Sequence, residues 1–186
     1  MSMEKLRTYY FGLYGENGIT QFFFDQLVGI METAKAGRSA ALRKQDKKGN
    51  DWYLSEKMVG MMLYLDKFSE DLINFEKKID YLADLGVTYV HFMPLLQSRE
   101  GQNDGGYAVS DYLNVDKKFG TTEQFERVIG KLKKKGIRTC IDFVLNHTAK
   151  EHEWALRSKK NEAGYEDMYY MFDNYGIPSE YEKTLT

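Results

Sequence analysis

The sequence contains few of the residues that cross-link or stiffen a chain. Of its 186 residues, one is cysteine and two are proline. A single cysteine, Cys140, cannot form an internal disulfide, and its position between Thr139 and Ile141 predicts a buried thiol within a strand. A disulfide-stabilised fold is therefore excluded.

Long hydrophobic runs are also missing. No apolar stretch approaches the ~20 residues needed to cross a bilayer, so we expect no membrane partner. Residues 1–7 carry charges with no apolar run behind them, so they do not have the pattern of a secretory signal. We expect a cytoplasmic protein.

An excess of basic residues is absent too. Lys and Arg number 26 against 28 Asp and Glu, which gives a formal net charge of -2. Because nucleic-acid binding needs a strong basic excess, we expect no nucleic-acid partner. Aromatic residues are abundant, with 14 Tyr and 11 Phe. Most are expected to fill a substantial core, although tyrosines also suit a site that stacks on sugars or bases.

The first third of the chain has the pattern of helices. Thr20 is placed to cap a helix that Gly37 ends, and residues 39–47 suit a second, shorter helix. The polar stretch 47–51 is predicted to be a loop. Because no strand pattern precedes about Met58, we expect residues 1–57 to form an N-terminal helical domain. The apolar residues at helical spacing in the first helix are Phe23, Phe24, Leu27, Ile30 and Met31.

After residue 57, strand and helix patterns alternate. This order implies parallel strands joined by right-handed crossovers. Thr121, with Gln124 three positions on, has the pattern of a capping box at the start of a helix that Gly136 ends. The predicted strands are 59–65, 87–93 and 137–145, the other predicted helix is 71–85, and a long polar loop is predicted over 95–120.

Such a sheet fits either a doubly wound fold or the start of a barrel. No Gly-rich phosphate loop follows any strand, which counts against a nucleotide-binding fold. Polar, aromatic loops follow the strands instead, as they do at the active-site end of a (β/α)₈ barrel. The expected fold class is therefore α/β: the helical domain, then the first three β/α units of a TIM-type barrel over residues 58–148. A full barrel needs about 250 residues, so we expect the barrel to be truncated.

Two loops carry side chains suited to chemistry. The first follows the second strand, and its adjacent glycines, Gly105 and Gly106, permit a tight turn that would hold Asp104 and Tyr107 close to a ligand. On spacing alone, a plain turn with a packed tyrosine is the slightly favoured alternative.

The second loop begins with Asp142 at the end of the third strand. A lone histidine is more often structural than catalytic, but Asn146 and His147 fall where that strand leaves the sheet, which makes a site role more credible. His147 and His152 lack the spacing of a helical zinc motif, so we give metal ligation little weight.

Segments along nearly the whole chain resemble one family. Residues 85–95 resemble the second strand of α-amylase superfamily enzymes, and Asp142 to His147 is similar to that family's first signature, an Asp followed by apolar residues and Asn-His. The loop Asp104-Gly105-Gly106-Tyr107 is similar to the sugar-pocket loop of amylosucrases, a branch of the superfamily (glycoside hydrolase family thirteen). Further segments that look like amylosucrase are Phe11–Gly15, Asp51–Ser55, Asn146–Thr148, Glu151–Ala155 and Met168–Phe172.

The resemblance implies a sucrose-acting, retaining glucosyltransferase. In amylosucrases glucose passes from sucrose to an α-glucan or oligosaccharide acceptor, and fructose is released. Carried over by position, Tyr107 would stack on the glucose ring, Asp104 would lie at the closed end of the pocket, and His147 would bind a glucose hydroxyl. Asp142 would brace the strand end and the loop that bears His147, with Asn146, Gly105 and Gly106 supporting the site. Many α-amylases bind calcium through the equivalent of Asn146, but amylosucrases generally do not, so we expect no metal and no cofactor.

The catalytic carboxylates of the family lie at the ends of its fourth and fifth strands. The nucleophile's Arg-x-Asp pattern is absent here, since none of the arginines is followed by Asp two positions later. We therefore expect an N-terminal fragment with no catalytic residue within this chain, so that the nucleophile and the acid/base would lie beyond Thr186. Residues 149–186 would begin the domain inserted after the third strand.

Two alternatives stay open. One is a sucrose hydrolase or a relative that converts trehalose or oligosaccharides. The other is a truncated product that binds sugar or a partner and catalyses nothing. The sequence leaves the acceptor, the product length and the oligomeric state undefined.

Overall fold

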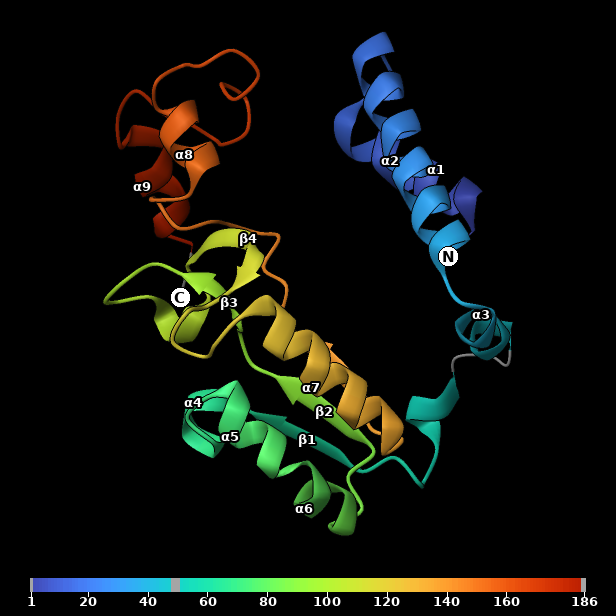
Figure 1. The fold of residues 1–186 in the computed structure, drawn as a ribbon. Helices are drawn as coiled ribbons and strands as arrows, with labels where there is room; N and C mark the ends of the chain where they lie inside the picture. Colours follow the sequence, from blue (N-terminus) through green and yellow to red (C-terminus); the bar gives the residue numbers. More distant parts are fainter. Residues whose placement is uncertain (1, 48–50, 185–186) are drawn as a thin grey trace. The chain divides into compact units, whose positions relative to one another are not determined.

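The structure, a computed structural model, describes residues 2–47 and 51–184. The described residues divide after Leu54 into two compact units (Figure 1). Among them, none of the helices is both long and apolar enough to span a bilayer.

The first unit is helical, as the sequence predicts. Phe11 of α1 and Phe24 of α2 are buried against each other, with ring centroids 5.2 Å apart. The Arg7 guanidinium lies 4.5 Å from the centre of the Phe11 ring. The predicted loop over 47–51 falls mostly outside the described residues. The elements are α1 (Met3–Tyr14), α2 (Gly18–Gly37), α3 (Ala40–Lys47) and the 3-10 helix η1 (Asp51–Leu54).

Helix α2 begins earlier than predicted. Its N-cap is Asn17, whose side chain accepts hydrogen bonds from the backbone N–H groups of Ile19 and Thr20. Thr20 occupies the third helical position, and its hydroxyl accepts from the Asn17 N–H. Thr20 is therefore half of a capping box rather than the cap itself.

The second unit is built on three parallel strands, which confirms the predicted sheet. They are β1 (Gly60–Leu63), β2 (Tyr89–Phe92) and β5 (Arg138–Ile141), in the order β1-β2-β5 (Figure 1). The pairing aligns Leu63 with Phe92 and Phe92 with Ile141, so the carboxyl ends of all three strands lie at one edge.

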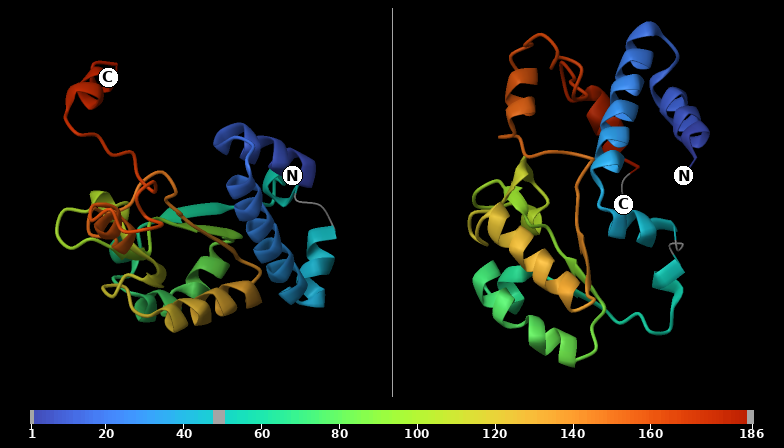
Figure 2. Two further views of the ribbon diagram at one scale, coloured as in Figure 1. Left: turned by 90° about the horizontal axis from the view of Figure 1, so that it is seen from above. Right: turned by 45° about the vertical axis from the view of Figure 1, so that its right-hand side comes forward.

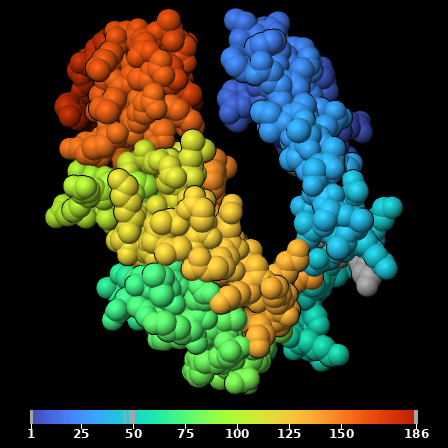
Figure 3. Space-filling model, viewed as in Figure 1, coloured from blue at the N-terminus to red at the C-terminus, as the bar shows by residue number. Residues whose placement is uncertain are grey.

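The core lies between one face of this sheet and four helices. Val90 and Phe92 of β2 are fully buried, and the Phe92 ring contacts Phe75 and Phe125 with centroids 4.9 and 5.8 Å away. The space-filling view shows the green helical segment α4–α6 packed against the yellow helix α7 (Figure 3). The helices are α4 (Leu65–Phe68), α5 (Leu72–Lys77), α6 (Ile79–Asp84) and α7 (Thr122–Lys134).

The opposite face of the sheet carries polar and aromatic side chains. Tyr89 and His91 alternate with the buried residues of β2 and are half-buried. Cys140, predicted to be buried, is also half-buried because it pairs with His91 on this face rather than on the helical side.

Several helices and strands are shorter than predicted. The first strand ends at Leu63, because Tyr64 is the N-cap of α4. The predicted helix 71–85 is broken at Lys78, whose ψ of 0° ends α5 and starts α6. The third strand ends at Ile141, four residues before the predicted end at Leu145, and Asp142 makes the last backbone bond to β2, at 3.2 Å to the Phe92 carbonyl.

The prediction of one long loop over residues 95–120 is wrong, because most of this segment is ordered as a hairpin. It folds into an antiparallel hairpin of β3 (Leu96–Ser98) and β4 (Val109–Val115), with the 3-10 turn η2 (Asp104–Gly106) between them (Figures 1 and 2). Its two strands pair irregularly, with register shifts on either side of Gln97.

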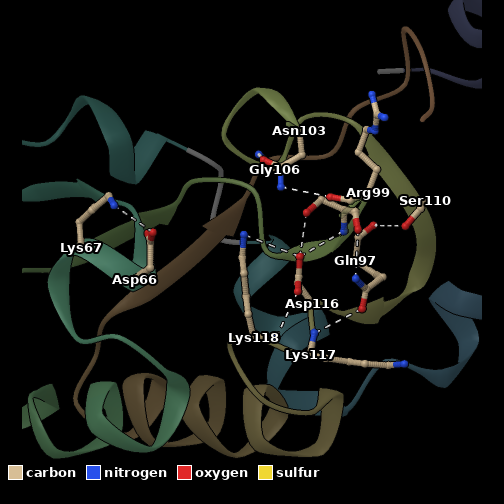
Figure 4. A network of polar contacts seen from close by, with 11 residues as sticks. Asp66, Lys67, Gln97, Arg99, Asn103, Gly106, Ser110, Asp116, Lys117 and Lys118 are labelled. Atoms are coloured by element: carbon tan, nitrogen blue, oxygen red, sulfur yellow. Dashed lines mark hydrogen bonds and ion pairs between the residues drawn. The ribbon is translucent and has the colours of Figure 1, made fainter. Parts of the chain in front are cut away.

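Polar contacts, of which those between Ser98 and Asp116 are buried, hold this hairpin (Figure 4). The Asp116 carboxylate, 6% exposed, accepts hydrogen bonds from the Ser98 N–H and, at 2.8 Å, the Ser98 hydroxyl. Ser110 donates to the Gln97 carbonyl, and the Gln97 side chain accepts from the Lys117 N–H. These bonds stabilise the hairpin that carries the turn η2.

Two short helices follow the sheet. They are α8 (Glu153–Ser158) and α9 (Gly176–Glu182), and no strand follows Ile141 among the residues that the structure describes. The predicted bounds of the domains, 1–57, 58–148 and 149–186, stay predictions. Thr186 lies outside the described residues, and the expectation that the nucleophile and the acid/base follow it also stays a prediction.

Candidate functional site

The two loops singled out in the sequence lie together at the carboxyl ends of β2 and β5. The Tyr107 hydroxyl donates to Asp142 Oδ2 at 2.8 Å. The Tyr112 hydroxyl lies within hydrogen-bonding distance of two carbonyl oxygens in the second loop, 2.6 Å from that of Val144 and 3.1 Å from that of His147. These bonds join the loop after the second strand to the loop after the third.

The turn that carries Tyr107 is shaped by its glycines. Asn103 starts it, and its side-chain oxygen accepts from the Gly106 N–H at 3.0 Å (Figure 4). Gly105 and Gly106 have φ values of 71° and 99°, where side chains are disfavoured. A Cβ on Gly106 would lie 3.0 Å from Cβ of Pro94, and one on Gly105 would lie 3.2 Å from the Tyr64 hydroxyl. The turn therefore packs directly onto residues that leave β1 and β2.

Asp142 stands at the centre of the site. Its Oδ1 lies 2.8 Å from His91 Nε2, and its Oδ2 accepts from Tyr107. The hydrogen bond to the carboxylate, together with burial, raises the pKa of Tyr107 to about 12. Because each carboxylate oxygen already has a protein donor, Asp142 is suited to hold neighbours in place rather than to attack a substrate or carry its proton.

Asp104 and His147 take no part in this contact network. Asp104 is exposed with a φ of 52°, and no hydrogen bond or ion pair of its side chain falls within the described residues. His147 is exposed, and its Nδ1 lies 3.3 Å from the Asn146 amide nitrogen. The structure thus brings Tyr107 and Asp142 into contact. Asp104 and His147 belong to the same two loops, but among the described residues their side chains form no hydrogen bond with Tyr107 or Asp142.

A second cluster fixes the loop after the third strand. The Tyr112 and Trp154 rings stack at 6.0 Å, and His152 lies 5.4 Å from the first and 4.7 Å from the second. His152 Nδ1 accepts from the Trp154 N–H and so caps α8. Burial lowers the pKa of His152, against the attraction of Asp111 and Glu153.

His91, Tyr64 and Tyr112 also contact the residues of the candidate site, although the sequence analysis gave them no role. A signal for His91 exists, since Tyr89 and His91 interrupt an apolar run at every second position. Such alternation marks one face of a strand as polar, and a polar face next to the strand's carboxyl end belongs to a site.

Within the described ranges, no group of three or more His, Cys, Asp or Glu side chains is placed to hold an ion.

The sequence matches one protein family over most of its length. The match, to the catalytic domain of alpha amylase, covers residues 43–184. Together with the parallel sheet and the loops at its carboxyl edge, this match shows that the chain belongs to the α-amylase family.

Two curated relatives are glycosidases by name. Maltase 1 of Drosophila virilis is 39% identical over 115 residues, which are 62% of this chain and 18% of that protein. An oligo-1,6-glucosidase of Heyndrickxia coagulans is 38% identical over 104 residues, or 55% of this chain and 18% of that protein.

Two solved structures share the fold. A MutB mutant in complex with the substrate sucrose is 34% identical with a TM-score of 0.57, over 66% of this chain and 23% of that one. The isomaltulose synthase SmuA from Protaminobacter rubrum is 31% identical with a TM-score of 0.59, over 66% of this chain and 22% of that one. The chain therefore spans about a fifth of the length of these four proteins.

Proposed function

We propose that the protein is a sucrose-acting, α-retaining glucosyltransferase of the amylosucrase type. One observation carries the proposal: Tyr107 is held by Asp142 at the carboxyl edge of the sheet, in a chain that is 34% identical to a protein solved with sucrose as its substrate. This edge of a (β/α)₈ barrel is where its enzymes place their sites.

In the proposed site the Tyr107 ring is the platform for the glucosyl ring of sucrose. Asp104 and His147, which are exposed, supply polar groups for glucose hydroxyls from the two loops. Gly105 and Gly106 let the turn approach the sheet closely, and Asp142 fixes the tyrosine.

In this proposal, the two carboxylates that react with the substrate come from a part of the protein outside this chain. A retaining reaction needs a nucleophile and an acid/base about 5 Å apart. In this proposal neither is a residue of this chain, and both follow Thr186 in the complete protein. Transfer to an α-glucan or oligosaccharide would then release fructose.

A second candidate is hydrolysis of α-glucosidic oligosaccharides. It is favoured by the maltase and the oligo-1,6-glucosidase, which are 39% and 38% identical to this chain. Hydrolysis of sucrose belongs to the same candidate, because water then replaces the sugar acceptor. A product that binds sugar without turnover is the third reading.

The test is turnover by the protein expressed from its complete reading frame, with sucrose, maltose and isomaltose offered separately. Fructose released from sucrose in excess over free glucose supports transfer. Equal fructose and glucose, or turnover of maltose or isomaltose without sucrose, supports the second candidate. No turnover of any of the three supports the third.

A matched pair of variants ties the activity to the site. Tyr107→Ala is expected to lower kcat/KM for sucrose by up to roughly tenfold, since an aromatic contact contributes about 0.5–1.5 kcal/mol. Tyr81→Ala is the control, because Tyr81 is an exposed tyrosine of α6, a helix on the other side of the sheet. Equal losses in the two variants would contradict the proposed role of Tyr107.

A further inference from the structure

His91 is a half-buried histidine of β2 that has no role in the proposed reaction. It lies on the polar face of β2, where its side chain is 27% exposed, and pairs in register with Met62 of β1 and Cys140 of β5. Its Nε2 lies 2.8 Å from Asp142 Oδ1.

We propose that His91 is a positioning residue of the sugar pocket: its Nε2–H fixes the Asp142 carboxylate, which in turn holds the Tyr107 hydroxyl and ring. The inference deepens the proposed function, because what the positioned ring binds rests on that proposal. The positioning itself rests only on the contacts between these three side chains.

The direction of the first hydrogen bond follows from chemistry. An ionised carboxylate can only accept, so His91 must carry its proton on Nε2 for this contact to form. The same holds for the second contact, in which the Tyr107 hydroxyl donates to the other oxygen of Asp142.

Two donors, one on each oxygen of Asp142, fix the orientation of the carboxylate, which a single donor does not. A carboxylate held at a single oxygen can still turn about its Cβ–Cγ bond, a torsion whose preference is broad. With His91 on Oδ1 and Tyr107 on Oδ2, that torsion is fixed and the tyrosine hydroxyl has one place to go. Loss of the His91 donor releases the carboxylate, and the hydrogen bond to Tyr107 weakens with it.

The contacts between His91, Asp142 and Tyr107 can be tested without any sugar, by measuring the ionisation of Tyr107. A tyrosine bonded to a carboxylate resists ionisation, and the pKa of Tyr107 is raised to about 12 by Asp142 and by burial. Replacing His91 removes a hydrogen-bond donor from Asp142 and leaves the carboxylate itself in place.

The experiment follows the ring-carbon NMR signal of Tyr107 in the 186-residue chain, assigned with Tyr107→Phe. In the unchanged chain Tyr107 should be almost wholly neutral at about pH 10.5, since its pKa is about 12. In His91→Leu its pKa should fall by a unit or more, so that roughly a quarter or more is ionised at that pH. Met62→Leu is the matched control, because it lies beside His91 in the sheet and has no hydrogen-bond donor.

Two amide variants separate positioning from a general effect of the substitution. His91→Gln places an N–H near the position of Nε2 and should restore the behaviour of the unchanged chain. His91→Asn places its amide near Nδ1, too short for Asp142, and should behave as His91→Leu. This pair decides the matter even if the leucine variant does not fold.

The proposal is overturned if Tyr107 ionises alike in the Gln and Asn variants, or if His91→Leu leaves its pKa unchanged. In the active protein, His91→Gln should keep kcat/KM for sucrose within about threefold, and His91→Asn should lose roughly tenfold. If the amide variants differ in the titration but the protein does not turn over sucrose, the positioning role stands and the proposed function fails.

Discussion

At the residue scale, Gly106 is the tightest point of the turn that carries Tyr107. Its φ is 99°, and a Cβ would lie 3.0 Å from Cβ of Pro94. We expect Gly106→Ala to lower the free energy of unfolding by about 2 kcal/mol or more, the sum of a left-handed backbone cost and a steric clash. Urea denaturation measures it.

The control for this prediction is Gly101→Ala in the same segment. Gly101 also has a positive φ, 75°, but no atom lies within 4 Å of where its Cβ would be. It should lose only the backbone term, about 1 kcal/mol. Equal losses at the two positions would show that the contact with Pro94 is not a close one.

The sequence predicted some site residues and missed others for a physical reason. Tyr107 and Asp142 follow strand ends, where loops after parallel strands build sites. Spacing alone slightly favoured a packed tyrosine in the first loop, so the predicted roles of these two residues came from the family resemblance. His91 lies inside a strand, where a half-buried side chain becomes a site residue only when a neighbouring strand brings a partner. That partner, Asp142, is 51 residues further along the chain, beyond the reach of local pattern.

At the scale of elements, helix α7 depends on its capping box. The Thr121 side chain accepts from the Gln124 N–H at 3.2 Å, and the Gln124 side chain accepts from the Thr121 N–H at 2.8 Å, as the sequence predicted. Thr121→Ala should lower the free energy of unfolding by about 1 kcal/mol. Glu126→Ala, at an exposed position within the same helix, should change it by less than about 0.5 kcal/mol.

The cap of α8 should make stability depend on pH. His152 caps this helix as an acceptor, through an unprotonated Nδ1, and burial holds its folded pKa below the ordinary value of about 6.5. The unfolded chain therefore takes up the proton first, so stability rises with pH through this range. The contribution should be complete above about pH 6.5 and decline as the pH falls through the lowered folded pKa.

Urea denaturation at about pH 7.5 and 5.5, on either side of the ordinary histidine pKa, measures this effect, with His152→Asn as the comparison. Asparagine still offers an acceptor to the Trp154 N–H but does not titrate. The loss of stability between the two pH values should be smaller in the variant. The same loss in both proteins would mean that other groups cause it.

Elements with strong local periodicity were predictable, and the hairpin was not. Helix α7 and the three parallel strands each carry their own apolar pattern. The β3–β4 hairpin is held instead by Asp116, which reaches back to Ser98 across 18 residues. A hydrogen bond of this kind forms only in the folded chain and leaves no local sequence pattern. The sequence analysis therefore predicted a loop from the Gly, Asn and Asp residues of this segment.

At the scale of the whole molecule, the 186-residue chain by itself should not release fructose from sucrose. The retaining reaction needs two carboxylates about 5 Å apart with free oxygens. Both oxygens of Asp142 accept hydrogen bonds from protein donors, and in the proposed site Asp104 binds a glucose hydroxyl. Fructose is measured with this chain and with the protein from the complete reading frame at equal concentration. Comparable rates would place the catalytic carboxylates among Asp104, Asp111, Asp116 and Asp142, rather than beyond Thr186.

The order of the parallel strands has a consequence for how the sheet is made during synthesis. Each strand after the first pairs with the parallel strand that precedes it in the chain, β2 on β1 and β5 on β2. Within this sheet, β2 and β5 therefore each meet a partner strand that has already been synthesised. Translation adds about 5–20 residues per second, and elements form locally far faster than that. The sheet can thus grow in one direction, from β1 through β2 to β5, as the polypeptide emerges.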